Sequence, residues 1–180
     1  MAQGRGMTMP NTMMRVICDN REGLPYDFRG LAVEVEHGTL ASGDLTLAGF
    51  ANRIALERKS LPDLIACLSG ERERFERELQ RLKAHDFSAV VVESPADDLR
   101  AGRYRSKMTP EAAWQSCLAL MQRYRVAFVF CRDRRDAEET AFHLMRHFHH
   151  DRERELAALG GSMAEKPGGN DHAGRATSAT

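Results

Sequence analysis

The stretch GDLTLAGFANRIALERKSLPD, residues 43–63, decides the fold of this chain. Each half of it alternates apolar and polar residues with a period of two, which is the pattern of a half-buried β-strand. The apolar positions are Leu45, Leu47, Ile54 and Leu56. Between the halves, residues 49–52 include a Gly and an Asn, which favour a turn. The stretch therefore predicts a β-hairpin over residues 43–60.

Strand parity gathers three charged side chains on one face of this hairpin. If the apolar positions share the core face, then Asp44, Glu57 and Lys59 lie together on the other face, because a one-residue slip would turn the whole apolar set to water. In the simplest register Asp44 lies directly across from Glu57, with Cβ atoms roughly 4.5–5.5 Å apart. Two like charges at that separation destabilise a sheet unless a positive group lies between them. The pair is therefore a candidate site for a divalent cation.

Lys59 adds a cationic group to the same face. It lies about 6.6 Å beyond Glu57 along the strand. From there an ammonium group can hold an attacking water or stabilise charge in the transition state of phosphodiester hydrolysis. The alternative interpretation is a solvated sheet face, on which Glu and Lys commonly alternate.

The order of these residues is similar to a known signature. It resembles the GD…ERKxxxD motif of the XPF-type (XPF/Hef-like) structure-specific endonucleases, a branch of the restriction-endonuclease-like nucleases. The matching residues are Gly43, Asp44, Glu57, Arg58, Lys59 and Asp63. The resemblance extends from about Arg15 to Asp151.

Segments on both sides of the signature agree with this family. Upstream, VICDNRE at residues 16–22 is similar to the family's opening strand, which ends in an Asp followed shortly by an Arg-Glu pair. Downstream, the family has a short helix, an Arg that begins the next helix, and a hydrophobic strand. Residues 61–68 and 89–92 fit the helix and the strand, and Arg74 fits the Arg, with Arg72 as a second candidate.

The resemblance implies both a fold and an activity. The implied fold is α/β, a three-layer restriction-endonuclease-like domain with a central mixed sheet flanked by helices. The implied activity is that of a hydrolase, a divalent-metal-dependent endodeoxyribonuclease that uses Mg²⁺ or Mn²⁺ and leaves a 5′-phosphate. Branched or flapped DNA would be the substrate, and DNA repair or recombination the setting. Most eukaryotic and archaeal members continue into a helix-hairpin-helix domain, whereas we expect a stand-alone nuclease domain here.

The resemblance also implies roles for individual residues. It assigns catalysis to Asp44, Glu57, Arg58, Lys59 and Asp63, and metal binding to Asp19, Asp44 and Glu57. By strand parity Arg58 points to the opposite face, where we expect it to hold a buried acid. Asp63, at the start of the following helix, is expected to orient Arg58 or Lys59.

DNA contacts must come from local basic clusters, because the 26 Lys and Arg residues balance 26 Asp and Glu residues. The best cluster is the segment from Arg100 to Lys107, which we call the basic loop. The predicted DNA-binding residues are Arg21, Arg74, Arg103, Arg105 and Lys107. In residues 71–84 four arginines alternate with glutamates, so a merely solvated helix face is the alternative there.

Periodicity and turn residues predict the remaining elements. We expect strands at 14–19, 31–37, 87–93 and 126–131, and helices at 61–69, 71–84, 109–124 and 134–157. Residues 1–13 are predicted to form a disordered leader and residues 160–180 a disordered tail, with the nuclease domain at 14–159.

Several features bear on partners and location. An apolar stripe on the last helix, formed by Ala137, Ala141, Leu144 and Phe148, favours core packing, with a homodimer seam through the C-terminal helices as the alternative. Four histidines cluster near the end of the last helix, at 143, 147, 149 and 150. His143 and His147 stand one turn apart, which suits zinc, although the helix dipole also favours histidines near a C-terminus. Four widely separated cysteines and the lack of a long apolar run predict a cytoplasmic protein with no membrane contact.

Two other functions compete with the endonuclease. One is a catalytically inactive DNA-binding or scaffold protein that has the nuclease fold. The other is a phosphodiesterase acting on a substrate other than nucleic acid, which the basic loop disfavours.

Overall fold

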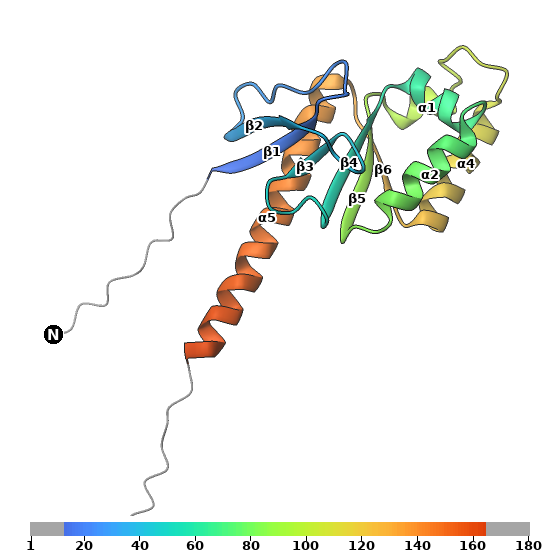
Figure 1. Ribbon diagram of the computed structural model, residues 1–180. Helices are drawn as coiled ribbons and strands as arrows, with labels where there is room; N and C mark the ends of the chain where they lie inside the picture. The colour runs from blue at the N-terminus through green and yellow to red at the C-terminus, as the bar shows by residue number, and fades with distance from the viewer. Residues whose placement is uncertain (1–12, 165–180) are drawn as a thin grey trace, which may run out of the picture. The chain divides into compact units, whose positions relative to one another are not determined.

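The predicted hairpin lies at the centre of a six-stranded sheet (Figure 1). The computed structural model of the protein describes residues 13–164. In chain order its elements are β1 (Met14–Asp19), β2 (Val33–Gly38), β3 (Leu45–Leu47), β4 (Ile54–Lys59), α1 (Leu61–Leu68), α2 (Arg72–Leu82), β5 (Phe87–Val92), α3 (Ala96–Arg100), α4 (Pro110–Tyr124), β6 (Ala127–Phe130) and α5 (Arg134–Ala164).

The sheet is mixed. Its strands lie in the order β2-β1-β3-β4-β5-β6. β3 runs antiparallel to both β1 and β4, whereas the pairs β1-β2, β4-β5 and β5-β6 are parallel. This arrangement places the carboxyl ends of β1 and β4 beside the amino end of β3. The charged residues of the hairpin lie at that meeting point.

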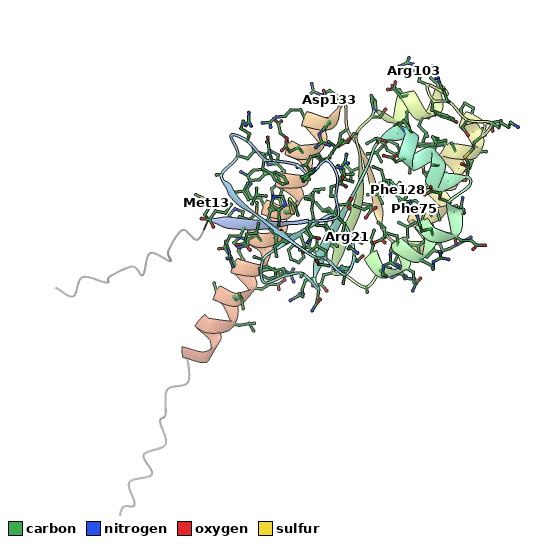
Figure 2. The ribbon with its side chains drawn as sticks, turned by 45° about the horizontal axis from the view of Figure 1, so that its top comes forward. Met13, Arg21, Phe75, Arg103, Phe128 and Asp133 are labelled. Carbon is green, nitrogen blue, oxygen red and sulfur yellow. The ribbon has the colours of Figure 1, made fainter. Side chains whose placement is uncertain are left out.

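Helices cover both faces of the sheet, which gives the predicted three layers. α1, α2 and α4 pack on one face over Ala55 and Val90, which lie on neighbouring strands. The N-terminal part of α5 packs on the other face, over Leu56 and Val91. On the first face the ring of Phe75 in α2 packs edge to face against the ring of Phe128 in β6, with 6.2 Å between the ring centroids (Figure 2). The fold class predicted from the sequence is confirmed.

Side-chain caps fix where two helices begin. Ser60, directly after β4, accepts a hydrogen bond from the backbone of Asp63, and Pro62 occupies the first turn of α1. Thr109 caps α4 in the same way, with a proline following it. α1 is therefore held directly after Lys59. The sequence did not predict α3, because five residues show no apolar periodicity.

Most element boundaries lie within two residues of the predictions, and the start of β2 and the end of α5 are the differences that matter here. β2 begins at Val33 rather than at 31, because the preceding residues form a turn in which Leu31 donates to the carbonyl of Phe28. α5 continues to Ala164, past the predicted end at 157 and into the predicted tail. Residues 1–12 of the predicted leader and 165–180 of the tail lie outside the described residues.

The apolar stripe of α5 is part of the protein's own core. Ala137, Ala141 and Phe148 are buried, and Leu144 packs against the same cluster. The core interpretation of the stripe is confirmed, because these side chains are covered within the chain, and a homodimer through the C-terminal helices stays a prediction. One compact unit ends at His149 and a second begins at His150. No helix within residues 13–164 is both long and apolar enough to cross a bilayer.

Candidate active site

The observed register brings the two predicted carboxylates face to face. Leu45 pairs with Leu56 across β3 and β4, which sets Asp44 opposite Glu57 as predicted. The backbone of Asp44 joins two further strands, since its N–H donates to the carbonyl of Leu56 at 2.8 Å and its carbonyl accepts the N–H of Asp19 at 2.8 Å. Asp44 is thus fixed between β1 and β4.

Gly43 allows this close approach. Its φ of +72° lies in the left-handed region, and a Cβ at this position would come within 2.9 Å of the carbonyl oxygen of Leu56. Any other residue would strain the turn or push it away from β4. The glycine of the GD pair therefore has a steric role in placing Asp44.

A cavity of about 290 Å³ opens beside these residues. Five carboxylates and two guanidinium groups line it, those of Asp19, Glu22, Asp44, Glu57, Glu78, Arg21 and Arg81. They come from β1 and the loop after it, from the segment before β3, from β4 and from α2. Such a concentration of acids around one hollow is typical of sites for hard cations.

Burial places the central carboxylates under electrostatic strain. The residue Glu57 is 7% exposed. Its burial, together with the negative charge of Asp44, raises its pKa to about 7. Burial also raises the pKa of Asp44, although its Oδ2 accepts the backbone N–H of Arg58 at 2.7 Å. Near neutral pH the pair therefore resists carrying two negative charges.

Lys59 compensates this charge only in part. Its Nζ donates to Oε1 of Glu57. Burial alone would lower the pKa of Lys59, but the adjacent Glu57 outweighs it and the pKa is raised, so the ammonium stays protonated at neutral pH. A second hollow of about 230 Å³ contains both residues and also Arg74 of α2. Arg72, the other candidate for the family's Arg, pairs instead with Glu76 at 2.6 Å.

Asp19, the predicted third metal ligand, is fully engaged by protein donors. Its Oδ1 accepts the backbone N–H and Nε of Arg21 at 2.8 and 2.9 Å. Its Oδ2 accepts Nη2 of Arg21 at 2.7 Å and the N–H of Leu40 at 2.9 Å. These bonds hold the pKa of Asp19 well below its usual range. The side chain of Arg21 is itself largely exposed.

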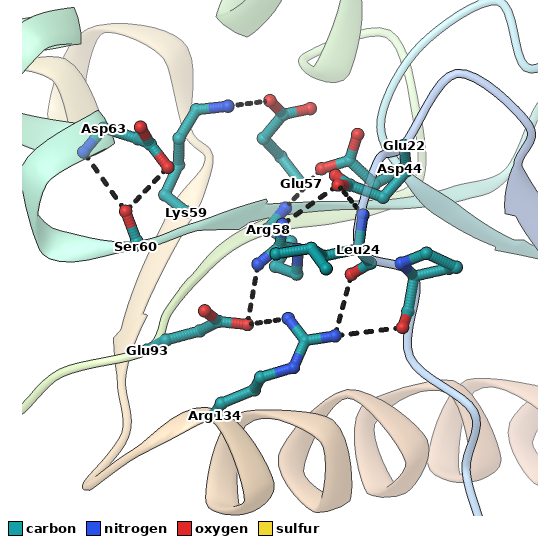
Figure 3. A network of polar contacts seen from close by, with 11 residues as sticks. Glu22, Leu24, Asp44, Glu57, Arg58, Lys59, Ser60, Asp63, Glu93 and Arg134 are labelled. Atoms are coloured by element: carbon teal, nitrogen blue, oxygen red, sulfur yellow. Dashed lines mark hydrogen bonds and ion pairs between the residues drawn. The ribbon is translucent and has the colours of Figure 1, made fainter.

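Arg58 points to the opposite face, as strand parity predicts. Its guanidinium bonds Glu22 at 3.0 Å and Glu93 at 2.9 Å, and Arg134 of α5 joins Glu93 at 3.0 Å (Figure 3). Burial would lower the pKa of Arg58, but these carboxylates outweigh it. Arg134 also donates hydrogen bonds to the backbone carbonyls of Leu24 and Pro25. The network ties the loop after β1 to β4, β5 and α5.

Comparisons with known proteins agree with this geometry. The model of the ERCC4 domain family matches residues 18–144, a span that contains every residue lining both cavities. The protein belongs to the ERCC4 domain family. No curated protein matches the sequence.

Solved structures with a similar fold include two of XPF from Aeropyrum pernix. One has a TM-score of 0.59 and 20% sequence identity, covering 91% of this chain and 67% of that chain. The other, in complex with DNA, has a TM-score of 0.59 and 23% identity, covering 74% of this chain and 64% of that chain. This ERCC4 domain thus has the fold of an XPF-type nuclease domain and spans about two thirds of the chains it matches.

Asp63 of the ERCC4 domain has a local partner. Its Oδ2 accepts the hydroxyl of Ser60 at 2.6 Å, and its N–H donates to the same hydroxyl (Figure 3). We expected it to orient Arg58 or Lys59. In the structure its carboxylate instead closes the cap of α1, because the capping serine lies three residues before it.

The basic loop lies beside α1. Arg103, Arg105 and neighbouring residues form a hollow of about 550 Å³ with the α1 residues Pro62 and Ile65. Arg103 pairs with Asp98 at 2.6 Å. Arg105 and Lys107 are exposed. The loop is anchored at its start, where the guanidinium of Arg100 lies 5.1 Å from the ring centroid of Trp114.

The structure adds two acids that sequence reasoning did not assign to the site, Glu22 and Glu78. Glu22 stands directly after Arg21, so its place in the Arg-Glu pair was a usable signal. Glu78 follows the core residue Phe75 by one helical turn, but alternating Arg and Glu residues hid it. Among the described residues, His143 and His147 form no three-ligand group of the kind that zinc requires.

Proposed function

We propose that this ERCC4 domain is a divalent-metal-dependent DNA endonuclease that hydrolyses phosphodiester bonds in branched or flapped DNA. One observation supports it above others. Asp44 and Glu57 face each other beside an open cavity, with raised pKa values and with the ammonium group of Lys59 adjacent. Such a pair is costly in a metal-free protein and is suited to a bound cation.

The donor atoms fit Mg²⁺ or Mn²⁺. Both ions prefer carboxylate oxygens, and Mg²⁺ sites often use one or two carboxylates with waters and substrate phosphate completing the shell. Among the described residues, none donates a hydrogen bond to Oδ1 of Asp44 or Oε2 of Glu57, so one oxygen of each is available. A bound metal would supply Lewis acidity and a more acidic water.

The chain's own residues would then have distinct tasks. Asp44 and Glu57 hold the ion, and Lys59 orients the attacking water and stabilises negative charge on the phosphate. Asp19 would supply a third carboxylate if Arg21 left it. Arg21 is exposed enough to turn to a DNA phosphate, which would release Asp19 as the substrate binds.

DNA contacts are proposed on two sides of the cavity. Arg74 lines the same hollow as Lys59 and so reaches the scissile region. The basic loop, beside α1, would bind the backbone further away through Arg103, Arg105 and Lys107. The solved complex of XPF from Aeropyrum pernix with DNA supports DNA as the substrate class.

The alternative is an inactive DNA-binding or scaffold protein. The observation that favours it is Asp19, whose two oxygens are occupied by Arg21 and Leu40. A domain that keeps this arrangement on DNA would lack its third metal ligand.

A labelled panel of single-stranded, duplex, flap, fork and four-way-junction DNA separates the two functions. The endonuclease should cut at least one branched substrate with Mg²⁺ or Mn²⁺ and none in chelator. Asp44→Asn should abolish cutting, whereas Asp27→Asn, at an exposed position outside the cavity, should cut as the parent does. Tight binding without cutting by the parent protein in either metal would support the inactive alternative.

A further inference from the structure

Glu78 of α2 occupies the border between the two hollows of the site. It lines the cavity of Asp44 and also the hollow of Lys59. Glu57 and Arg81 also line both of them. Its side chain is only 19% exposed, although it projects from a helix that is otherwise rich in exposed charges. The catalytic tasks proposed above do not use it.

The two oxygens of Glu78 contact different elements. Oε1 accepts the hydroxyl of Ser42 and the backbone N–H of Gly43, each at 3.2 Å. Oε2 accepts from the guanidinium of Arg81, one turn further along α2. Glu78 thus ties a helix to a turn that lies 35 residues earlier in the chain.

The turn it holds is the one that sets Asp44. Gly43 is in the left-handed region and closely approaches the backbone of Leu56, so the turn has few alternative conformations. Among the described residues, Glu78 is the acceptor of its N–H and no backbone carbonyl takes that place, so the donor would lose its protein partner without Glu78. Displacement of Gly43 would shift the carboxylate that follows it directly in sequence.

We propose that Glu78 is a positioning residue for Asp44, which fixes the turn at residues 42–43 and thereby sets the affinity of the Asp44–Glu57 pair for a divalent cation. This proposal rests on the function proposed above. The ion pair with Arg81 joins two residues of the same helix and does not reach the turn, so it cannot by itself position Asp44. The contacts of Oε1 with the turn are what distinguish Glu78 from its neighbour Glu73, which is 92% exposed.

Calorimetric titration with Mn²⁺ in the absence of DNA tests the proposal without relying on activity. Glu78→Ala should weaken binding by roughly 10–100-fold, the loss typical when a group that orients a metal ligand is removed. Glu78→Gln should stay within about threefold of the parent, because its amide oxygen still accepts from Ser42 and Gly43. Glu73→Ala is the matched control on the same helix and should bind as the parent does.

Two further variants keep the test decisive. Ser42→Ala removes one of the two bonds to Oε1 and should weaken binding less than Glu78→Ala, which identifies the turn as the route of the effect. Arg81→Ala should leave Mn²⁺ affinity nearly unchanged. Saturating Mn²⁺ should restore the cleavage rate of Glu78→Ala, since a positioning defect lowers metal occupancy, whereas misfolding would not be rescued.

The outcomes distinguish this proposal from the proposed function. A parent that binds Mn²⁺ and cuts DNA, with Glu78→Ala binding equally well, overturns the role of Glu78 alone. The role of Glu78 is also overturned if Glu78→Gln binds Mn²⁺ as weakly as Glu78→Ala does. The same holds if Arg81→Ala binds Mn²⁺ as weakly as Glu78→Ala. In both cases the charge of the side chain, rather than its bonds to the turn, would set the affinity. A parent that binds no metal and cuts no DNA overturns both.

Discussion

Replacing Glu57 by Gln should make the metal-free protein more stable at alkaline pH and leave it unchanged at acid pH. The reason is the pKa of Glu57, which burial and the charge of Asp44 raise from 4.5 to about 7. A carboxyl whose pKa is raised by folding stabilises the folded state below its unfolded value, and that contribution is lost as pH rises through the folded value. Glutamine mimics the protonated acid throughout.

The size of the effect follows from the same values. One pH unit is worth about 1.4 kcal/mol, so a pKa raised from 4.5 to about 7 corresponds to up to about 3 kcal/mol. The free energy of unfolding of Glu57→Gln should equal that of the parent near pH 4. Its advantage should grow between about 4.5 and 7 and level off above that. Asp19 does not disturb this window, because its pKa is lowered and its contribution is lost only in stronger acid.

Urea unfolding followed by circular dichroism, in chelator and across this pH range, measures the difference. The m-value should stay constant, so that midpoints report stability. Mn²⁺ at about 1,000 times its Kd should then reverse the order, because it adds about 4.1 kcal/mol to the parent and little to the variant. Glu73→Gln is the exposed control. The strained carboxylate pair would be refuted if the free energies of unfolding of the parent and of Glu57→Gln differed by a constant amount from pH 4 to 8 and Mn²⁺ did not stabilise the parent.

Three other predictions concern the neighbouring cations. Lys59→Ala should keep Mn²⁺ affinity within a few-fold at about pH 8 while single-turnover cleavage falls by roughly two to three orders of magnitude; near-normal cleavage would remove Lys59 from catalysis. Arg21→Gln should raise Mn²⁺ affinity without DNA by about an order of magnitude, since Asp19 gains free oxygens; unchanged affinity in the titration would exclude Asp19 as a ligand. Neutralising the three cations of the basic loop at 103, 105 and 107 should flatten the log–log salt dependence of duplex binding by up to about 0.9 per lost phosphate contact, and an unchanged slope would move the DNA surface elsewhere.

The local pattern of the hairpin was enough to place the central residues. Because side chains alternate strictly along a strand, the apolar set Leu45 and Leu56 fixes the face of Asp44, Glu57 and Lys59 without knowledge of any neighbour. The position of Arg58 on the opposite face follows from the same rule. The caps of α1 and α4 were also readable, since a serine or threonine before a proline is a local signal.

Other predicted roles depended on neighbours that the sequence does not reveal. Asp19 stood at the right strand end, but its bidentate pairing with Arg21 depends on how the loop after β1 turns back. Asp63 was assigned toward Arg58 or Lys59 and bonds Ser60 instead. In both cases a short-range partner competes with the expected one, and the backbone path decides between them.

The sequence by itself determined the register of the hairpin, the face that carries its charges and the start of the helix that follows, because these depend on periodicity and on contacts within a few residues. The tertiary structure decided which acids share the cavity. Glu78 and Glu73 look alike in the run of Arg and Glu residues of α2, yet one is largely buried against the turn before Asp44 and the other is exposed. The difference arises from the packing of Phe75 and its helix against the sheet, which rotates a single glutamate toward the site. That rotation is a long-range property of the core, so no local pattern could specify it.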